Sequence, residues 1–270
     1  MRLSVTHETI YRYGTPASSV IQTLRLTPRG HDGQFVVGWR VELDRDCRMP
    51  AATDAFGNTV HTFTLAGPVD ALTISAIGVI ETEDTAGMVR GQVERFPPAV
   101  FLRDTPLTIA DPAIRDFAAT IATGGHAGLD LLHNLAAAVK ERMTFDTGPT
   151  DARTTAPEAF HHGHGVCQDF AHIFIASARH LGIPARYVSG YLYRADLVEQ
   201  EAGHGWAEAL VDDLGWVGFD PTNGVSASEA YARIAIGLDY LNAAPVRGTR
   251  YGGGDETLEV RVRVENGGPR

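Results

Sequence analysis

Residues 163–184 read GHGVCQDFAHIFIASARHLGIP, and this stretch predicts a helix that begins at Cys167 and ends near His180. One face of the helix is apolar, and the Gly182-Ile183-Pro184 that follows is a typical stop signal. The free N–H groups and the dipole at a helix start favour a thiolate over a thiol. Cys167 is therefore a candidate nucleophile, although burial as a structural residue is the commonest fate of a cysteine.

A nucleophilic cysteine needs a base, and the base needs a group that orients it. His204 precedes a predicted strand over 206–211, which returns as a second strand over 216–220 that ends in Asp220. An odd number of loop residues places His204 and Asp220 on one face of this hairpin. A five-residue loop (210–214) puts them directly opposite each other, and a three-residue loop puts them diagonally. An even number would separate them. The hairpin thus predicts His204 as the base and Asp220 as its orienting group.

The first hundred residues alternate between apolar and polar side chains, a period of two that is typical of strands. Turn residues interrupt this pattern at Gly14-Thr15-Pro16, Pro28-Arg29-Gly30, Phe56-Gly57-Asn58 and Gly67-Pro68. Several short strands with such turns indicate an antiparallel sandwich or barrel. We therefore expect a β-rich N-terminal domain over residues 1–103.

Beyond residue 103 the pattern changes to helices followed by strands. Asp111 and Pro112 are a typical helix start, and Gly124-Gly125 ends that helix. A second helix is predicted over 129–142. The predicted strands lie at 186–193, 206–211, 216–220 and 258–264. This order indicates the α+β class, with a second domain over residues 104–270 that includes the C-terminal strand.

Composition and charge exclude several classes of partner. The chain of 270 residues is 44% hydrophobic and 21% charged, the balance of a globular protein with a core. Its net charge of −10 and its lack of a Lys/Arg run argue against nucleic acid or an anionic membrane. No segment reaches the ~18 apolar residues of a transmembrane helix, and residues 1–8 lack the apolar core of a signal peptide. The two cysteines form no disulfide framework, so we expect a cytoplasmic location.

Three residues near the proposed triad are candidates for contact with substrate. His161, His162 and His164 form a cluster whose spacing matches no zinc motif, so we expect no metal there, and His164 is a candidate substrate-binding residue instead. Trp206 either faces the substrate or, as is commoner for an aromatic residue in a hairpin, belongs to the core. Asp169, in the first helical turn, suits the helix dipole and is also placed to orient groups of the loop.

Three ordered motifs resemble the bacterial transglutaminase-like superfamily. GVCQDFAH (165–172) is similar to its nucleophile segment, HGWAE (204–208) to its histidine segment and GWVGFDPTN (215–223) to its aspartate segment. The separations of 37 residues from Cys167 to His204 and 16 from His204 to Asp220 also fit. Residues 1–29 and 237–248 resemble the N-terminal domain and C-terminal segment of these proteins. Gly205 stands where the family has alanine, and we expect it to loosen the start of the strand.

The resemblance implies a papain-like, transglutaminase-like core and covalent chemistry. The Cys167 thiolate attacks an amide of a peptide or protein, and water or an amine then resolves the thioester. A backbone N–H at Cys167 and a second, unidentified donor would hold the oxyanion. Bacterial members of this set are often cysteine-protease-like, which favours hydrolysis of a peptide, isopeptide or γ-glutamyl-type amide. The alternatives are protein-glutamine transamidation and a non-catalytic binding scaffold. The chemistry requires no cofactor, and no loop has calcium-ligand spacing.

Overall fold

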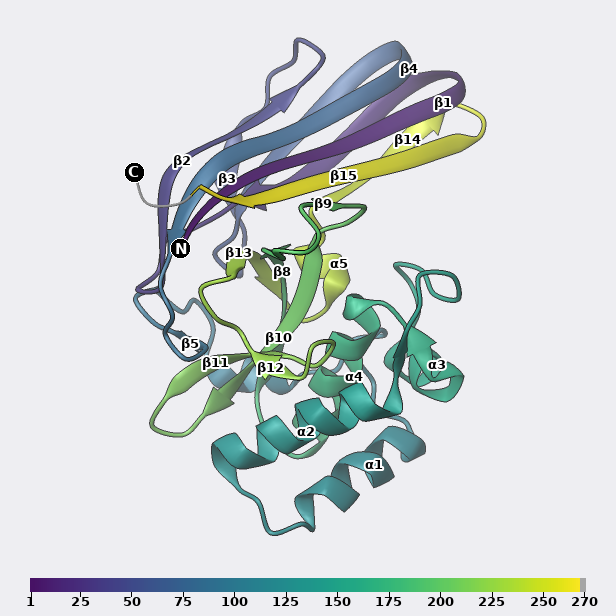
Figure 1. Cartoon of the computed structure of the whole chain (residues 1–270). Helices are drawn as coiled ribbons and strands as arrows, with labels where there is room; N and C mark the ends of the chain where they lie inside the picture. The colour runs from purple at the N-terminus through teal and green to yellow at the C-terminus, as the bar shows by residue number, and fades with distance from the viewer. Residues whose placement is uncertain (268–270) are drawn as a thin grey trace.

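Two antiparallel sheets and a group of helices form the framework of the chain in the computed structural model, which describes residues 1–267 (Figure 1). The first sheet contains β1 (Arg2–Thr27), β2 (Gln34–Leu43), β3 (Ala51–Thr53), β4 (Thr59–Thr82), β9 (Glu199–Gln200), β14 (Val246–Gly252) and β15 (Glu256–Asn266). The second contains β5 (Met88–Val89), β8 (Ala185–Leu192), β10 (His204–Val211), β11 (Gly215–Asp220), β12 (Val225–Ser226) and β13 (Tyr231–Gly237). A short parallel pair, β6 (Thr144–Phe145) and β7 (His164–Gly165), lies just before α4. The helices are η1 (Pro98–Leu102), α1 (Pro112–Ala122), α2 (Gly128–Arg142), α3 (Ala156–His162), α4 (Cys167–His180) and α5 (Tyr240–Ala243).

The strand order places the two ends of the chain in one sheet. The first sheet has the order β2-β4-β1-β15-β9, with β14 also paired to β1 and β3 to β4. The second has the order β12-β11-β10-β8-β13, with β5 paired to β11. α2 and α4 pack against the second sheet, and α1 and α3 pack on α4 at the end of the molecule away from the first sheet, whereas α5 lies beside β8 and β13 (Figure 1). This mixed, mostly antiparallel arrangement confirms the predicted α+β class.

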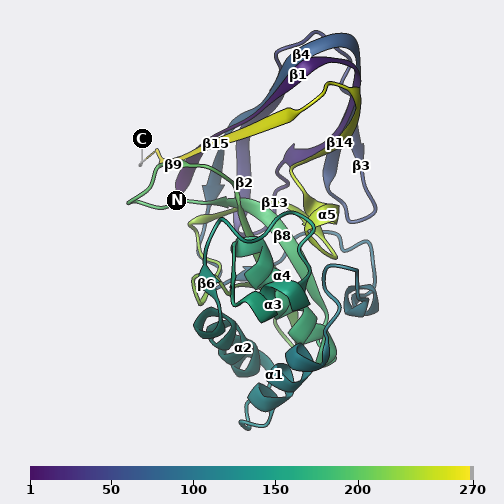
Figure 2. The same ribbon diagram turned by 90° about the vertical axis from the view of Figure 1, so that its right-hand side faces the viewer.

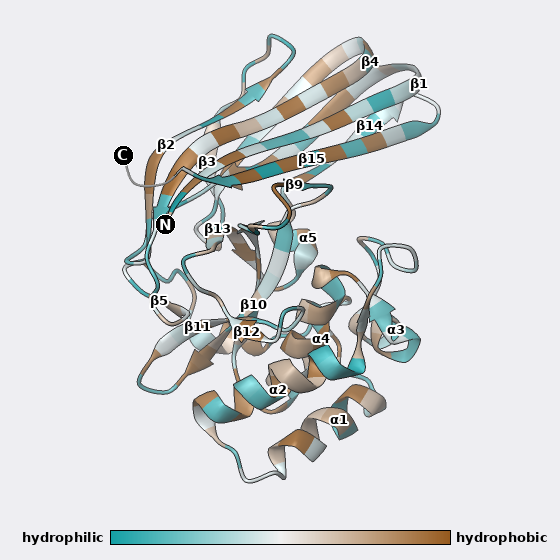
Figure 3. Cartoon of the chain, in the orientation of Figure 1, coloured by the Kyte–Doolittle hydropathy of each residue, from teal (hydrophilic) through white to brown (hydrophobic). Residues whose placement is uncertain are grey.

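The N-terminal strands are longer than the turn signals predicted. Gly14-Thr15-Pro16 lies inside β1, where the register with β4 shifts between Arg12 and Ala17, and Gly67-Pro68 lies inside β4. The expected turns at these two places were wrong, because glycine and proline are also tolerated at a bulge, where ladder hydrogen bonds are interrupted. Both strands bend there, and the sheet curves over one apolar cluster (Figure 2). Figure 3 shows the alternating apolar and polar bands along these strands.

The C-terminal strands differ from their expected place in the second domain. β15 pairs with β1 from Leu3 opposite Asn266 to Tyr13 opposite Glu256, and β14 pairs with the other half of β1. The buried Val262 and Val264 explain this position, because they pack in one apolar cluster with Leu3 and the neighbouring strands. Residues 246–266 therefore belong structurally with the first sheet, so a division at residue 103 does not separate the two sheets.

The predicted helices begin and end close to their expected residues. Oδ1 of Asp111 accepts the backbone N–H of Ile114 at 2.9 Å and caps α1, with Pro112 at its first position. α4 spans Cys167–His180, as the apolar pattern and stop signal predicted, and α1, α2 and α3 pack around it. Within residues 1–267, none of the helices combines the length and the apolar character that crossing a membrane requires.

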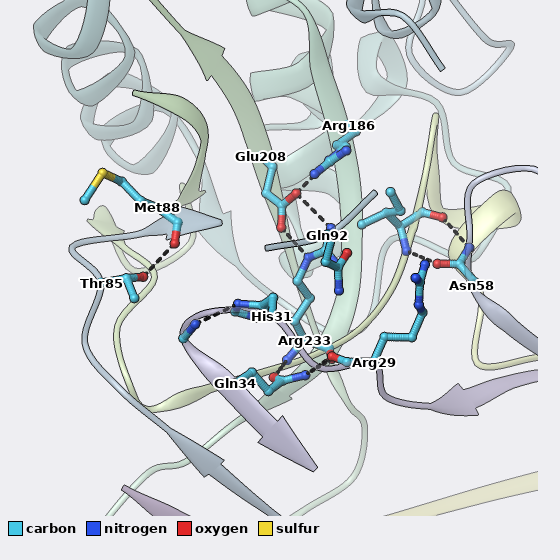
Figure 4. A network of polar contacts seen from close by, with 12 residues as sticks. Arg29, His31, Gln34, Asn58, Thr85, Met88, Gln92, Arg186, Glu208 and Arg233 are labelled. Carbon is cyan, nitrogen blue, oxygen red and sulfur yellow. Dashed lines mark hydrogen bonds and ion pairs between the residues drawn. The ribbon is translucent and has the colours of Figure 1, made fainter. Parts of the chain in front are cut away.

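A buried ionic network joins three strands of the second sheet (Figure 4). Glu208 of β10 accepts hydrogen bonds from Arg186 of β8 at 2.6 Å and from Arg233 of β13 at 2.6 and 3.1 Å. The Glu208 and Arg186 side chains have no exposed surface, and that of Arg233 is 8% exposed. Arg186 also bonds Glu94, and Arg233 bonds Gln92, so the network reaches the segment that connects the first sheet to the helices.

Two carboxamides close the outer edge of β13 and join the two sheets (Figure 4). Gln34 of β2 donates to the carbonyl of Arg233 and accepts its N–H, both at 2.8 Å. Asn58, before β4, bonds Ile236 in the same way at 2.8 and 2.9 Å. Both amides take the place of a neighbouring strand at this edge, so the backbone groups of Arg233 and Ile236 are not available for pairing with another chain.

Glu208→Gln should destabilise the fold by about 3–5 kcal/mol, because it leaves the buried Arg233 without its carboxylate partner and leaves Arg186 with Glu94 alone. Burial alone would raise the pKa of Glu208, but Arg233 and Arg186 lower it from 4.5 to about 2. The stabilisation is therefore present above pH 4.5 and is lost as the pH falls from 4.5 through 2. Urea unfolding at several pH values measures both effects.

Glu42→Gln, which breaks an exposed pair with Arg40, is the matched control and should leave stability unchanged. Equal unfolding free energies for Glu208→Gln and the unaltered chain would contradict this account.

Candidate active site

The β10–β11 hairpin brings His204 and Asp220 together. Ala207 pairs with Phe219 and Val211 with Gly215, so the loop consists of the three residues 212–214. An odd loop places both side chains on one face, and this length gives the diagonal arrangement. Nε2 of His204 lies 2.6 Å from Oδ2 of Asp220. The predicted geometry of the hairpin is therefore confirmed, in its three-residue form.

Asp220 is a buried carboxylate with a full set of hydrogen-bond donors. Besides His204, its Oδ2 accepts from the Tyr231 hydroxyl at 2.8 Å and from Nδ2 of Asn223 at 2.6 Å, while Oδ1 accepts the backbone N–H groups of Thr222 and Asn223. Burial alone would raise the pKa of Asp220, but these contacts, first that with His204, lower it. Asp220 therefore stays charged. Sequence reasoning did not assign Asn223 and Tyr231, although Asn223 lies in the aspartate motif.

The His204 ring lies between Asp220 and the Cys167 thiol. Burial alone would lower the pKa of His204, but the hydrogen bond to Asp220 and the interaction with Cys167 raise it to about 10. The imidazole is therefore protonated at neutral pH. Trp206 stacks against it at 6.1 Å between ring centroids and is 2% exposed. Trp206 does not line the cavity that contains Cys167, and its contacts with His204 and Tyr231 orient the imidazole instead.

Asp169 holds the loop in front of Cys167. Its Oδ2 accepts the N–H of Val166 at 2.8 Å and the hydroxyl of Thr150 at 2.7 Å. Burial raises the pKa of Asp169 in spite of these two hydrogen bonds. A Cβ at Gly165 would meet the Asp169 side chain at 2.5 Å, so glycine permits the close approach. Asp169 therefore positions the loop before Cys167, and it does not line the cavity next to Cys167.

A cavity of about 230 Å³ lies between the two sheets and contains both Cys167 and His204. Its catalytic-core wall includes Cys167, Tyr187, His204, Gly205 and Tyr240. Its other wall comes from the first sheet, with His7, Thr9, Tyr11, Leu258 and Val260. Sequence reasoning missed this second wall. The one available signal was the pair of polar residues His7 and Thr9 at inward-facing positions of an otherwise apolar strand face.

Two other buried histidines, His7 and His172, have lowered pKa values and hydrogen-bond partners elsewhere, so neither is a good candidate for the base. Burial lowers the pKa of His7 to about 4, and its ring nitrogens bond Tyr191 and Thr9. Burial likewise lowers the pKa of His172 to about 3, and its Nε2 accepts the backbone N–H of Tyr240 at 3.0 Å. His172 is thus a packed residue that anchors α5.

The histidine cluster lies outside the cavity. His164 is half-exposed, with its Nδ1 3.7 Å from Oδ2 of Asp146, and it does not line the cavity. His161 bonds Asp111 at 2.8 Å. Across residues 1–267, no three His, Cys, Asp or Glu side chains are grouped as metal ligands would be. Cys47 is a free thiol that packs against the apolar cluster of the first sheet.

Gly205 was expected to loosen the start of its strand, but the structure shows that it has a packing role. A Cβ at this position would overlap the hydroxyl of Tyr187, which reaches across from β8. Glycine therefore makes room for the Tyr187 side chain and does not simply loosen the strand. Tyr187 is 2% exposed, and it lines the cavity with Cys167.

Known proteins share this sequence pattern and this fold. The model of the bacterial transglutaminase-like N-terminal region matches residues 3–81, and that of the transglutaminase-like superfamily matches residues 115–221. An uncharacterised protein of Mycobacterium leprae is 32% identical over 97% of this chain and 98% of its own length. One of Mycobacterium tuberculosis is 30% identical over 97% of this chain and 92% of its own length.

A crystal structure from Cytophaga hutchinsonii, described as a candidate cysteine protease, has the same fold. It superposes with a TM-score of 0.80 at 18% identity and covers 100% of this chain and 92% of its own. The matches to both regions, the near full-length relatives and this shared fold agree with one another. The chain therefore belongs to the transglutaminase-like superfamily and carries the N-terminal region of its bacterial members.

Proposed function

We propose that this chain is a thiol-dependent acyl-transfer enzyme, with Cys167 as nucleophile, His204 as acid and base, and Asp220 as the orienting carboxylate. One observation carries the proposal. His204 is hydrogen-bonded to a buried, charged Asp220 and lies in the same cavity as Cys167, which opens a helix. A nucleophile, a base and an orienting group in this order are the requirements of covalent acyl transfer.

The reaction proceeds through a thioester. The thiolate of Cys167 attacks the amide carbon and forms the C–S bond, while the carbonyl electron pair moves to oxygen and the Cys167 backbone N–H stabilises it. The oxyanion collapses, the C–N bond breaks, and His204 donates its proton to the leaving amine. Water or an amine then attacks the thioester carbon, and His204 takes a proton from this attacking molecule. The C–S bond breaks, and the Cys167 thiolate is restored.

The raised pKa of His204 suits the first half of this cycle. An imidazolium at neutral pH is ready to protonate the leaving amine, and its positive charge stabilises the neighbouring thiolate. Asp220 cannot take the proton away, because its own pKa is lowered by several hydrogen bonds. Its role is to fix the ring and to stabilise the charged form of His204.

We propose hydrolysis of a peptide, isopeptide or γ-glutamyl-type amide as the reaction. Transamidation of protein glutamine shares every step up to the thioester and differs only in the acceptor. A non-catalytic scaffold would have no chemical need for a buried charged carboxylate beneath His204. We also propose a reducing, cytoplasmic location, which the two free thiols, Cys47 and Cys167, support.

Cys167→Ala should abolish turnover, because the thiol supplies the nucleophile, and it should leave the fold intact, because alanine suits the start of α4 and removes only the contact of the thiol with His204. Alkylation by iodoacetamide at neutral pH, followed by mass spectrometry, should modify Cys167 faster than a free model thiol. Cys47→Ala is the matched control and should retain both activity and fast alkylation. Turnover that persists in Cys167→Ala would refute the assignment.

Asp220→Asn should lower turnover by roughly 10²- to 10⁴-fold, because the imidazole loses its orienting charge. In the unaltered chain the imidazolium persists up to pH about 10, so activity should decline only above it. In Asp220→Asn this alkaline decline should move to lower pH. The pH dependence of Cys167-dependent turnover measures the shift. Asp212→Asn, an exposed carboxylate of the hairpin loop, should behave like the unaltered chain. An unmoved alkaline limb in Asp220→Asn would count against the proposed pair.

Mass spectrometry of a peptide-amide panel decides the acceptor. The enzyme is incubated with the panel with and without an added primary amine. Hydrolysed product in both samples is the expected result. Amine adducts as the main product would replace hydrolysis by transamidation while leaving the thioester mechanism in place.

A further inference from the structure

We propose that an extended segment of the substrate polypeptide binds as an added strand along the free edge of β15, beside Leu258 and Val260. The inference rests on the proposed function, because this strand would carry the amide to Cys167. It assigns a substrate class: an unfolded or extended stretch of polypeptide, with basic side chains favoured.

The backbone of β15 has unused hydrogen-bonding groups on its outer edge. Its inner edge pairs with β1 from residue 256 to 266. Within residues 1–267, the only strand on its outer edge is β9, which pairs with Val262 and Arg263. The N–H of Val264 donates outward to the carbonyl of Val198 at 3.1 Å. Because these groups alternate along a strand, those of Leu258 and Val260 point to the same outer edge, beyond the end of β9.

This free edge borders the proposed catalytic centre. Leu258 and Val260 line the cavity that contains Cys167, and both also line an open groove of about 840 Å³ along β15 and β9. The two hollows therefore share these two residues of β15. Leu258 is an apolar side chain that is 55% exposed, a suitable contact for a side chain of the added strand.

Within the chain, β9 already pairs with β15 in the way that we propose for the peptide. It joins β15 antiparallel at residues 199–200, and the chain reaches His204 four residues after Gln200. A peptide at residues 258–260 would continue the row that β9 begins. At ~3.4 Å per residue, a few residues of an added strand span the free part of this edge. The peptide would therefore end beside the cavity that holds Cys167 and His204.

The charge of the groove favours basic peptides. Its lining includes four carboxylates against two guanidinium groups, and these are Glu8, Glu199, Glu201 and Glu259 against Arg261 and Arg263. Both arginines are already paired, Arg261 with Glu259 and Arg263 with Glu265 and Glu199. Glu8 and Glu201 have no ion-pair partner in the described part of the chain. Exposed charges of this kind select partners weakly and in a salt-dependent way.

The main test measures binding without turnover. A fluorescent ten-residue peptide with lysines is titrated into Cys167→Ala, and fluorescence anisotropy reports the Kd. A series of the same peptide then carries one backbone N-methyl group at each successive position. Strand addition predicts weakening by about tenfold at every second position of the bound stretch and no change between, since only alternate N–H groups face the protein. Equal affinity across the series would overturn strand addition.

Variants of β15 test the same edge from the protein side. Leu258→Pro removes the outward N–H and should weaken peptide binding by about tenfold, while its ladder with β1 keeps its bonds. Leu258→Ala is the matched control, because it keeps the N–H and loses only the side chain, so its loss should be smaller. Equal losses of peptide affinity in the two variants would overturn the backbone contact. If Leu258→Pro does not fold, the N-methyl series on the Cys167→Ala chain still tests this contact.

The two proposals can fail separately. A capped single glutamine amide is too short to pair with β15, so its Cys167-dependent turnover in the unaltered chain tests the chemistry alone. If the enzyme turns over this compound but peptide affinity does not alternate along the N-methyl series, the docking edge is wrong and the proposed function stands. Alternating peptide affinity with no Cys167-dependent chemistry would overturn the function and support the edge. A glutamate-containing peptide should bind more weakly at low salt, and equal affinity would overturn the preference for basic segments.

Discussion

The buried contact of Glu208 with two arginines is the interaction on which the rest of the arrangement depends. Glu208 lies on the same face of β10 as His204 and Trp206, because side chains alternate along a strand. Its partner Arg233 is held in turn by Gln34 from the first sheet. A one-residue change of register in β10 would therefore have two effects at once. It would turn the Glu208 charge away from its arginine partners, and it would turn His204 away from Asp220. One carboxylate therefore stabilises the strand that carries the proposed base and fixes it relative to the other sheet.

Features that depend on neighbouring residues in the sequence were predictable. α4 begins at Cys167 and ends at His180 because its apolar period and its stop signal are local. The diagonal contact of His204 with Asp220 follows from the parity of one short loop. The bends at Gly14-Thr15-Pro16 and Gly67-Pro68 were not predictable as such, since the same residues end a strand or kink it according to what pairs alongside.

Features that depend on distant pairing were not predictable. The alternating valines near the C-terminus indicate which face is buried, but not that β15 lies beside β1, so the second wall of the cavity was missed. Asp169 and Trp206 were predicted to lie near Cys167 and His204, the proposed nucleophile and base, because they are neighbours in the two motifs. Their contacts show that they position the loop and the imidazole. His164 points to Asp146, because the short strand before Cys167 turns it toward solvent.

The pairing of β1 with β15 has a consequence for the order in which the protein folds. Leu3 lies opposite Asn266, so this ladder closes almost the whole chain into one loop. Contacts between residues this far apart form slowly, since the entropy of loop closure is lost before they contribute stability. The helices around α4 and the β10–β11 hairpin involve short separations and can assemble first. We therefore expect the thiol and imidazole to meet early in folding, and the wall that would receive a polypeptide to close over them late.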